Sequence, residues 1–210
     1  MNRSVFLLLI FLVNTVISSA QSPSLFFERV TSKDGLSNDQ VNCILQDKRG
    51  FIWIGTNDGL NRFDGHNFLI FRNHPGDTTS ISGNTINDII EDNDGILWIA
   101  TGDGGLARYD YHKEPSLQFK QYKHQPGDNR SIPENTINAM AQDNYGYLWL
   151  ATSGSAVIRF NKHTGQFDFP VPGGPLSRIL WAPAAAISSA LLARAWPTIS
   201  LKSLACVTLV

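Results

Sequence analysis

The sequence has little cysteine, no excess of positive charge and no apolar run long enough for a comfortable membrane span. Two cysteines, Cys43 and Cys206, cannot build a disulfide scaffold or a zinc site with four thiolate ligands. The 210 residues carry 17 Lys and Arg against 18 Asp and Glu, so we expect no nucleic acid contact by this segment. Hydrophobic residues at 42% and aromatic residues at 10% exclude wholesale disorder.

Motifs that carry catalysis or bind cofactors are also missing. The chain has no Gly-x-x-x-x-Gly-Lys loop, no His-Glu-x-x-His pair and no Gly-x-Ser-x-Gly elbow. The segments around Asp92 and Asp103 resemble fragments of calcium loops but lack the full ligand spacing, so we interpret them as turns. His74 and His124 recur in matched linkers and are interpreted as loop residues, and Cys43 as a buried or semi-buried thiol. We therefore expect no enzyme activity and no catalytic, cofactor or metal residues, and the sequence does not name the ligand-binding residues.

Charge is distributed unevenly along the chain. All 18 acidic residues lie between Glu28 and Asp168, together with 13 of the 17 basic ones, so this part has a formal net charge of −5. Before it, Arg3 precedes an apolar stretch and the small residues Ser18-Ser19-Ala20. This pattern predicts a secretory signal peptide over residues 1–20, hence export to the periplasm, with a signal anchor as the alternative.

Three copies of one sequence unit follow the leader. Trp53, Trp98 and Trp149 each lie six residues after an Asp, with a Gly in between, and each is followed two residues later by Gly or Ala and then by Thr. The spacing of the tryptophans is 45 and 51 residues. A repeat of this period indicates a modular all-β architecture.

Each unit is predicted to form four short antiparallel strands, because aromatic and β-branched runs alternate with Asp, Asn and Gly turns. The expected strands are 41–46, 51–55, 60–63 and 67–72; 86–91, 96–100, 106–109 and 117–122; and 137–142, 147–151, 157–160 and 166–169. Four strands per unit predict β-propeller blades at about 36–72, 81–122 and 132–169, within a partial propeller over residues 21–172. Residues 25–30 are expected to form an N-terminal closure strand, and the tryptophans to pack between blades.

These motifs resemble the two-component regulator propeller repeat, over about residues 25–168. The resemblance implies the N-terminal periplasmic sensor portion of a hybrid two-component histidine kinase of the Bacteroides type, here truncated. It further implies an extracytoplasmic segment that senses a small molecule or oligosaccharide. It also implies missing blades, a kinase, a receiver and DNA-binding parts elsewhere, and a homodimer anchored in the inner membrane. Two alternatives remain: an exported propeller enzyme, such as a lyase or glycan-active protein, and a protein-interaction scaffold.

The last segment, residues 173–210, departs from this pattern. From Pro175 onward it has eight alanines and no Asp, Glu, Asn, Gln or Gly, where a fourth repeat is due. A shifted reading frame near Val171–Pro175 is the interpretation we favour, over a short membrane helix or a capping domain. Three blades alone are expected to leave open sheet edges that favour aggregation, so it is open whether this segment folds alone.

Overall fold

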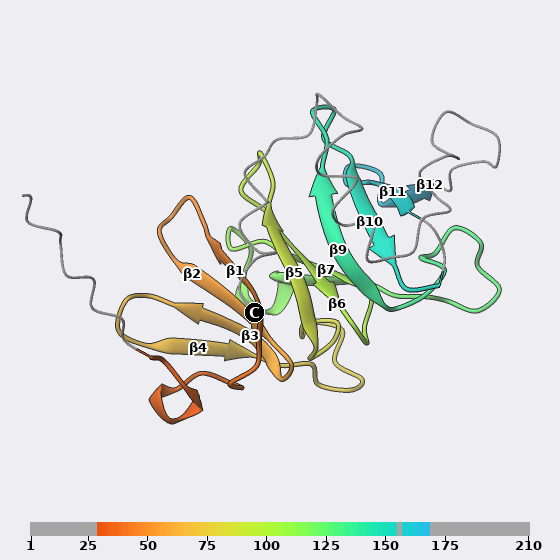
Figure 1. The fold of residues 1–210 in the computed structure, drawn as a ribbon. Helices are drawn as coiled ribbons and strands as arrows, with labels where there is room; N and C mark the ends of the chain where they lie inside the picture. Colours follow the sequence, from red (N-terminus) through yellow and green to blue (C-terminus); the bar gives the residue numbers. More distant parts are fainter. Residues whose placement is uncertain (1–28, 155–156, 169–210) are drawn as a thin grey trace, which may run out of the picture.

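The computed structural model describes residues 29–154 and 157–168, and these form three four-stranded antiparallel sheets with very little helix (Figure 1). In each sheet the strands are paired in chain order, as a meander. The first sheet comprises β1 (Val41–Gln46), β2 (Ile52–Thr56), β3 (Gly59–Phe63) and β4 (Phe68–Phe71). The second comprises β5 (Ile86–Glu91), β6 (Leu97–Thr101), β7 (Leu106–Tyr109) and β8 (Phe119–Tyr122). The third comprises β9 (Ile137–Gln142), β10 (Leu148–Thr152), β11 (Val157–Asn161) and β12 (Gln166–Asp168). The prediction of an all-β propeller with four strands per blade is confirmed.

Within the described residues, two predicted strands are shorter than expected: the strand predicted over residues 67–72 is β4, and the other lies in the second repeat. The strand predicted over residues 117–122 begins at Phe119, because Pro115–Leu117 form a single 3-10 turn, η2. Proline fixes its own φ and lacks an N–H group, so it begins a helical turn more readily than it joins a sheet. The other short helix, η1, covers Ser32–Asp34. No helix among the described residues is long and apolar enough to cross a membrane.

The predictions for the two ends of the chain fall mainly outside the described residues. The signal peptide over residues 1–20 and the divergent segment over residues 173–210 lie entirely outside them. Of the expected closure strand, the structure describes Arg29 and Val30, and these two residues lie in no strand.

The hydrophobic core lies between the sheets. One cluster joins the first and second sheets through residues that include Trp53, Leu60, Ile86 and Ile99. A second cluster joins the second and third sheets in the same way, with Trp98 as its largest member. Each sheet therefore buries its apolar face only by stacking on a neighbour, as expected for a repeat architecture.

Four aromatic rings recur at both interfaces. Trp53 lies 5.2 Å from Tyr109 of the next sheet, and Trp98 lies 5.4 Å from Phe160 of the next, both edge to face. Phe71 and Phe119 complete the first set of rings, and the second set is completed by Tyr122 and Phe167. The prediction that Trp53 and Trp98 pack between blades is confirmed.

Asparagine side chains join the innermost strands. The amide of Asn42 on β1 donates to the Ile86 carbonyl at 3.0 Å, and the amide of Asn87 on β5 donates to the Ile137 carbonyl at 2.8 Å. In Figure 1, β5 accordingly lies between β1 and β9. Asn42 and Asn87, which follow the first β-branched residue of the first and second repeats, thus connect neighbouring blades, whereas Asn138 donates to Ser153 of its own repeat.

Candidate ligand-binding site

Loops from all three sheets meet at one edge of the molecule. Because antiparallel strands alternate in direction, the β2–β3 and β6–β7 loops lie at the same edge as the segments that join one sheet to the next. Backbone hydrogen bonds confirm this arrangement: Gly59 N donates to Asn84 O at 2.7 Å, and Gly105 N donates to Asn135 O at 2.8 Å. We call this edge the mouth; its described residues are 57–58, 72–85, 102–105, 123–136 and 153–154.

The two segments that join the sheets have the same internal bonding. Asn84 Oδ1 accepts a hydrogen bond from Asn73 N at 2.7 Å, and Asn135 Oδ1 accepts one from His124 N at 2.8 Å. His124 therefore occupies the structural position of Asn73, although the sequence comparison matched it with His74. Its Nδ1 lies 2.8 Å from the Ile132 carbonyl. These side chains hold the loops in place.

Carboxylates at the mouth come from opposite loops in the second and third repeats. Asp103, in the β6–β7 loop, accepts from the backbone N–H groups of Asn84 and Thr85 at 3.2 and 3.3 Å. In the third repeat Glu134 accepts from Gly154 N at 2.8 Å, and Glu134 stands where the second repeat has Gly83. A Cβ atom on Gly83 would overlap Asp103 Oδ1, so only one of the two positions can carry the side chain.

The first repeat uses its carboxylate differently again. Asp58, at the position of Asp103, pairs with Arg72 at 2.9 Å, and both side chains are exposed. The mouth thus presents amide groups, hydroxyl groups and carboxylates, which suits hydrogen bonding to a polar ligand. Among the described residues, no group of three His, Cys, Asp or Glu side chains could hold a metal ion.

Strand β5 carries a carboxylate where the other repeats do not. Asp88 occupies the position of Cys43 and Ala139, and its Oδ2 accepts from Met140 N of the next sheet at 2.7 Å. Cys43 is 3% exposed, so the prediction of a buried or semi-buried thiol is confirmed. Asp88 therefore acts as a further connection between the second and third blades.

The turns at the opposite edge contain a bond that sequence reasoning missed. In each repeat the turn Asp accepts from two backbone N–H groups with Oδ1, as an Asp-Gly turn predicts. Its Oδ2 also accepts from the Trp indole six residues later, at 2.8, 3.0 and 2.9 Å for Asp47, Asp92 and Asp143. The constant six-residue interval was the signal for this bond. Asp92 is thus bound as a turn residue, as the sequence predicted.

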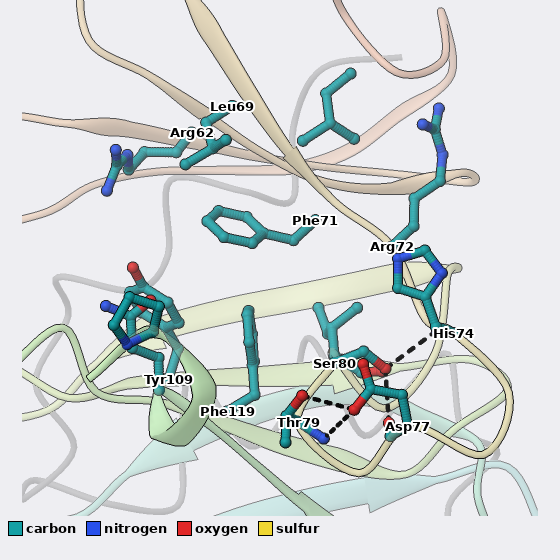
Figure 2. A pocket seen from close by; sticks show the side chains of 14 residues that line it. Arg62, Leu69, Phe71, Arg72, His74, Asp77, Thr79, Ser80, Tyr109 and Phe119 are labelled. Carbon is teal, nitrogen blue, oxygen red and sulfur yellow. Dashed lines mark hydrogen bonds between the residues drawn. The ribbon is translucent and has the colours of Figure 1, made fainter. Parts of the chain in front are cut away.

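A groove of about 500 Å³ opens on the side of the molecule between the first and second sheets (Figure 2). In Figure 2, Arg62 and Tyr109 lie at one end of the groove, His74, Ser80 and Asp77 at the other, and Phe71 and Phe119 between them. No sequence motif indicated this groove, because its walls come from two repeats.

Comparison with protein-family models gives one match: the two-component regulator propeller model fits residues 35–58, 80–103 and 131–154. Each matched segment begins six residues before the first strand of a repeat and ends in the loop after its second strand. Among curated proteins, histidine kinase P4 of Formosa agariphila is 48% identical over 81 residues. That match covers 39% of this chain and 6% of the kinase.

Two solved structures resemble the chain in fold and in sequence. One, named as the extracellular domain of hybrid two-component system BT3049 from B. thetaiotaomicron, is 30% identical with a TM-score of 0.62. The match covers 70% of this chain and 20% of that domain. The extracellular domain of hybrid two-component system BT4673 is 27% identical, with a TM-score of 0.52, over 63% of this chain and 18% of the domain. The chain spans at most a fifth of these three relatives.

Proposed function

This chain carries three two-component regulator propeller repeats, and from that premise we propose that it forms part of the ligand-sensing, extracytoplasmic portion of a hybrid two-component sensor. The observation that carries the proposal is the combined sequence and fold similarity to extracellular domains of such systems. The signal-peptide pattern of residues 1–20 supports export of the same segment to the periplasm.

The mouth is the part of the segment best suited to contact a ligand. Its loops come from every blade, and loops held on a rigid β scaffold commonly carry binding residues. Its carboxylates and amides would bind the hydroxyl groups of a small polar molecule, of which an oligosaccharide is the ligand we favour. Kinase activity, dimer formation and gene regulation would belong to parts of the sensor other than these residues.

The test is genetic and biochemical. In the source bacterium, deletion of the gene should abolish induction of specific transcripts by one member of a panel of oligosaccharides, and the complete sensor should bind that member. A matched pair of substitutions in the complete sensor, Asn57→Ala at the mouth and Asn93→Ala in the opposite turn, should weaken induction only for the first. Absence of any transcript change on deletion, together with absence of binding across the panel, would exclude a sensing function.

Export has a separate test. Residues 1–30 fused to an alkaline phosphatase reporter should give activity outside the cytoplasm, whereas a fusion from residue 21 onward should not. Activity that is equal in both fusions would contradict the signal-peptide prediction.

A further inference from the structure

Two arginines of the first blade lie around one aromatic ring, and neither has a carboxylate partner among the residues that the structure describes. The guanidinium carbon of Arg62 is 4.7 Å from the centre of the Phe51 ring, and that of Arg49 is 5.4 Å from the same centre. Arg49 also lies 4.2 Å over Tyr111 of the next blade. None of the ion pairs among the described residues includes either arginine, and the buried Nε of Arg62 has no hydrogen-bond partner.

The corresponding arginines of the other repeats are paired with acids of the chain itself. Arg108 binds Asp110 at 2.9 Å, and Arg159 binds Asp168 at 2.8 Å. In the first repeat, Asp64 corresponds to Asp110, and both accept from backbone N–H groups of their own turns with Oδ1, but no ion pair among the described residues joins Asp64 to Arg62. The residue paired with Arg62 across the strands is Leu69, where Arg159 has Asp168.

The turn that carries Arg49 also differs in charge from its counterpart. In the second repeat the corresponding residue is Asp94, and Lys162 of the third blade bridges Asp92 and Asp94 at 2.9 and 2.8 Å. At the interface between the first and second blades, Arg49 stands where the next interface has Asp94, and Tyr111 stands where it has Lys162. The buried carboxylate here, Asp47, already accepts from Trp53 and from two backbone N–H groups.

Of these two arginines, Arg62 lines the groove of Figure 2 and lies with Tyr109 at one end of it. Burial raises the pKa of Tyr109, and the nearby charges of Arg62 and Arg49 act in the opposite direction. The half-buried Phe71 and the exposed Leu69 also line the groove. A volume of about 500 Å³ falls in the range of small-molecule sites.

We propose that Arg49 and Arg62 bind the carboxylate of a small ligand, and that the flat apolar part of the same molecule lies in the groove against Phe71. The ligand's carboxylate would do for Arg62 what Asp110 and Asp168 do for the arginines of the other repeats. Guanidinium groups favour carboxylates because they offer parallel N–H donors, and aromatic walls favour planar groups. This site opens on the side of the molecule and shares His74, Asp77 and Ser80 with the mouth at its far end, and it does not rest on the sensing function.

The test uses the full 210-residue chain and three small probes, with binding followed by ligand-observed NMR. Benzoate should bind more tightly than acetate by about fivefold, because acetate lacks the ring. Benzamide has the ring without the charge and should bind about tenfold more weakly than benzoate.

Variants locate the site. Arg62→Gln and Arg49→Gln should each lower the affinity for benzoate about tenfold. Arg159→Gln, the matched control in the third repeat, should change it less than twofold, and far-ultraviolet circular dichroism should be the same for all chains. Equal loss in all three variants, or no loss with Arg49→Gln and Arg62→Gln, would overturn the proposal. Equal affinity for acetate and benzoate would overturn the assignment of the groove.

Discussion

At the scale of single residues, Asp92 joins three parts of the molecule. Its Oδ1 accepts from the N–H groups of Asp94 and Ile96, which closes its own turn, and its Oδ2 accepts from the Trp98 indole. The same Oδ2 lies 2.9 Å from Lys162 of the next blade, whose side chain is 6% exposed. One carboxylate therefore serves a turn, a core side chain and an interface.

Removing that carboxylate should be costly. We expect Asp92→Ala to lower the free energy of unfolding by about 3–5 kcal/mol, because it leaves two backbone N–H groups and the Trp98 indole without an acceptor and removes the buried one of the two carboxylates at the Lys162 ammonium group. Asp94→Ala is the control: Asp94 contacts the same lysine but is 62% exposed, so its loss should cost less than about 1 kcal/mol. Urea unfolding of the two variants measures the difference, and equal effects would contradict this account.

Acid should protonate three loop carboxylates and so weaken the hydrogen bonds that they accept. Hydrogen bonds lower the pKa of Asp64 mainly through Asn67 N, of Asp77 mainly through the Thr79 hydroxyl, and of Asp128 mainly through Arg130 N. Because each folded pKa lies below the ordinary value of 3.8, the stabilisation is present above that pH and is lost as pH falls through the folded values.

The triple variant Asp64→Asn, Asp77→Asn, Asp128→Asn keeps a side-chain acceptor at each turn but no longer titrates there. Its urea midpoint should fall less between pH 5 and pH 2 than that of the unsubstituted chain. Parallel decreases in the two proteins would show that these carboxyls do not contribute to the acid sensitivity.

At the scale of strands, β1 and β2 pack together because a small residue on β2 lies opposite a larger one on β1. Gly55 lies opposite Cys43, whereas Ala100 lies opposite Asp88 and Ala151 opposite Ala139. A Cβ atom on Gly55 would overlap Cys43 Sγ and would lie 2.6 Å from Ile86 Cγ2 of the next blade. The first blade has room for the thiol because it lacks the methyl group.

Gly55→Ala should therefore destabilise the chain by about 1–3 kcal/mol through overpacking. Adding Cys43→Ala, which reproduces the pair of the third repeat, should recover part of that loss. The double-mutant cycle, measured by chemical denaturation, tests the coupling, and additive effects of the two substitutions would contradict it.

Much of the strand pattern was predictable from the sequence, and the reasons are local. The turns after Gln46, Glu91 and Gln142 carry Asp and Gly at fixed positions, and the Trp-containing runs between turns have β propensity. The Pro115 turn was missed because aromatic residues further along suggested a longer strand. The hydrogen bond between the turn Asp and the Trp indole could be seen only in the folded turn, although the six-residue interval between the two residues was visible in the sequence.

The sites were less predictable than the strands. The family resemblance implied a ligand-sensing segment without binding residues, and the different placement of Asp103 and Glu134 is seen only when two loops are side by side. Asp64 and Asp110 both accept from their own turns with Oδ1, but among the described ion pairs only Asp110 binds its arginine with Oδ2, a difference that a sequence comparison does not show.

At the scale of the whole molecule, the three sheets form a linear array in which each contacts its neighbour. Ile86 and Ile137 are both fully buried and occupy the same position in successive repeats, one at each interface. In such an array, stability is approximately a sum of blade and interface contributions.

We expect Ile86→Val and Ile137→Val each to lower the free energy of unfolding by about 1 kcal/mol. The double variant should lose the sum to within about 0.5 kcal/mol, because the two substitutions lie at separate interfaces. Denaturant titration of the four chains gives the answer. A marked departure from additivity would mean that the second blade transmits changes from one interface to the other.

The mouth carboxylate comes from the β6–β7 loop in the second repeat and from the segment before β9 in the third, which limits how segments can be exchanged between repeats. Asp103 requires glycine at position 83, and Glu134 faces glycine at position 154, so the two loops of a repeat are compatible only as a set. A chimera cut between those loops would bring together two carboxylates or two glycines. The unit of exchange is therefore the stretch that holds both loops, residues 80–103 or 131–154, rather than a whole sheet from its first strand to its fourth.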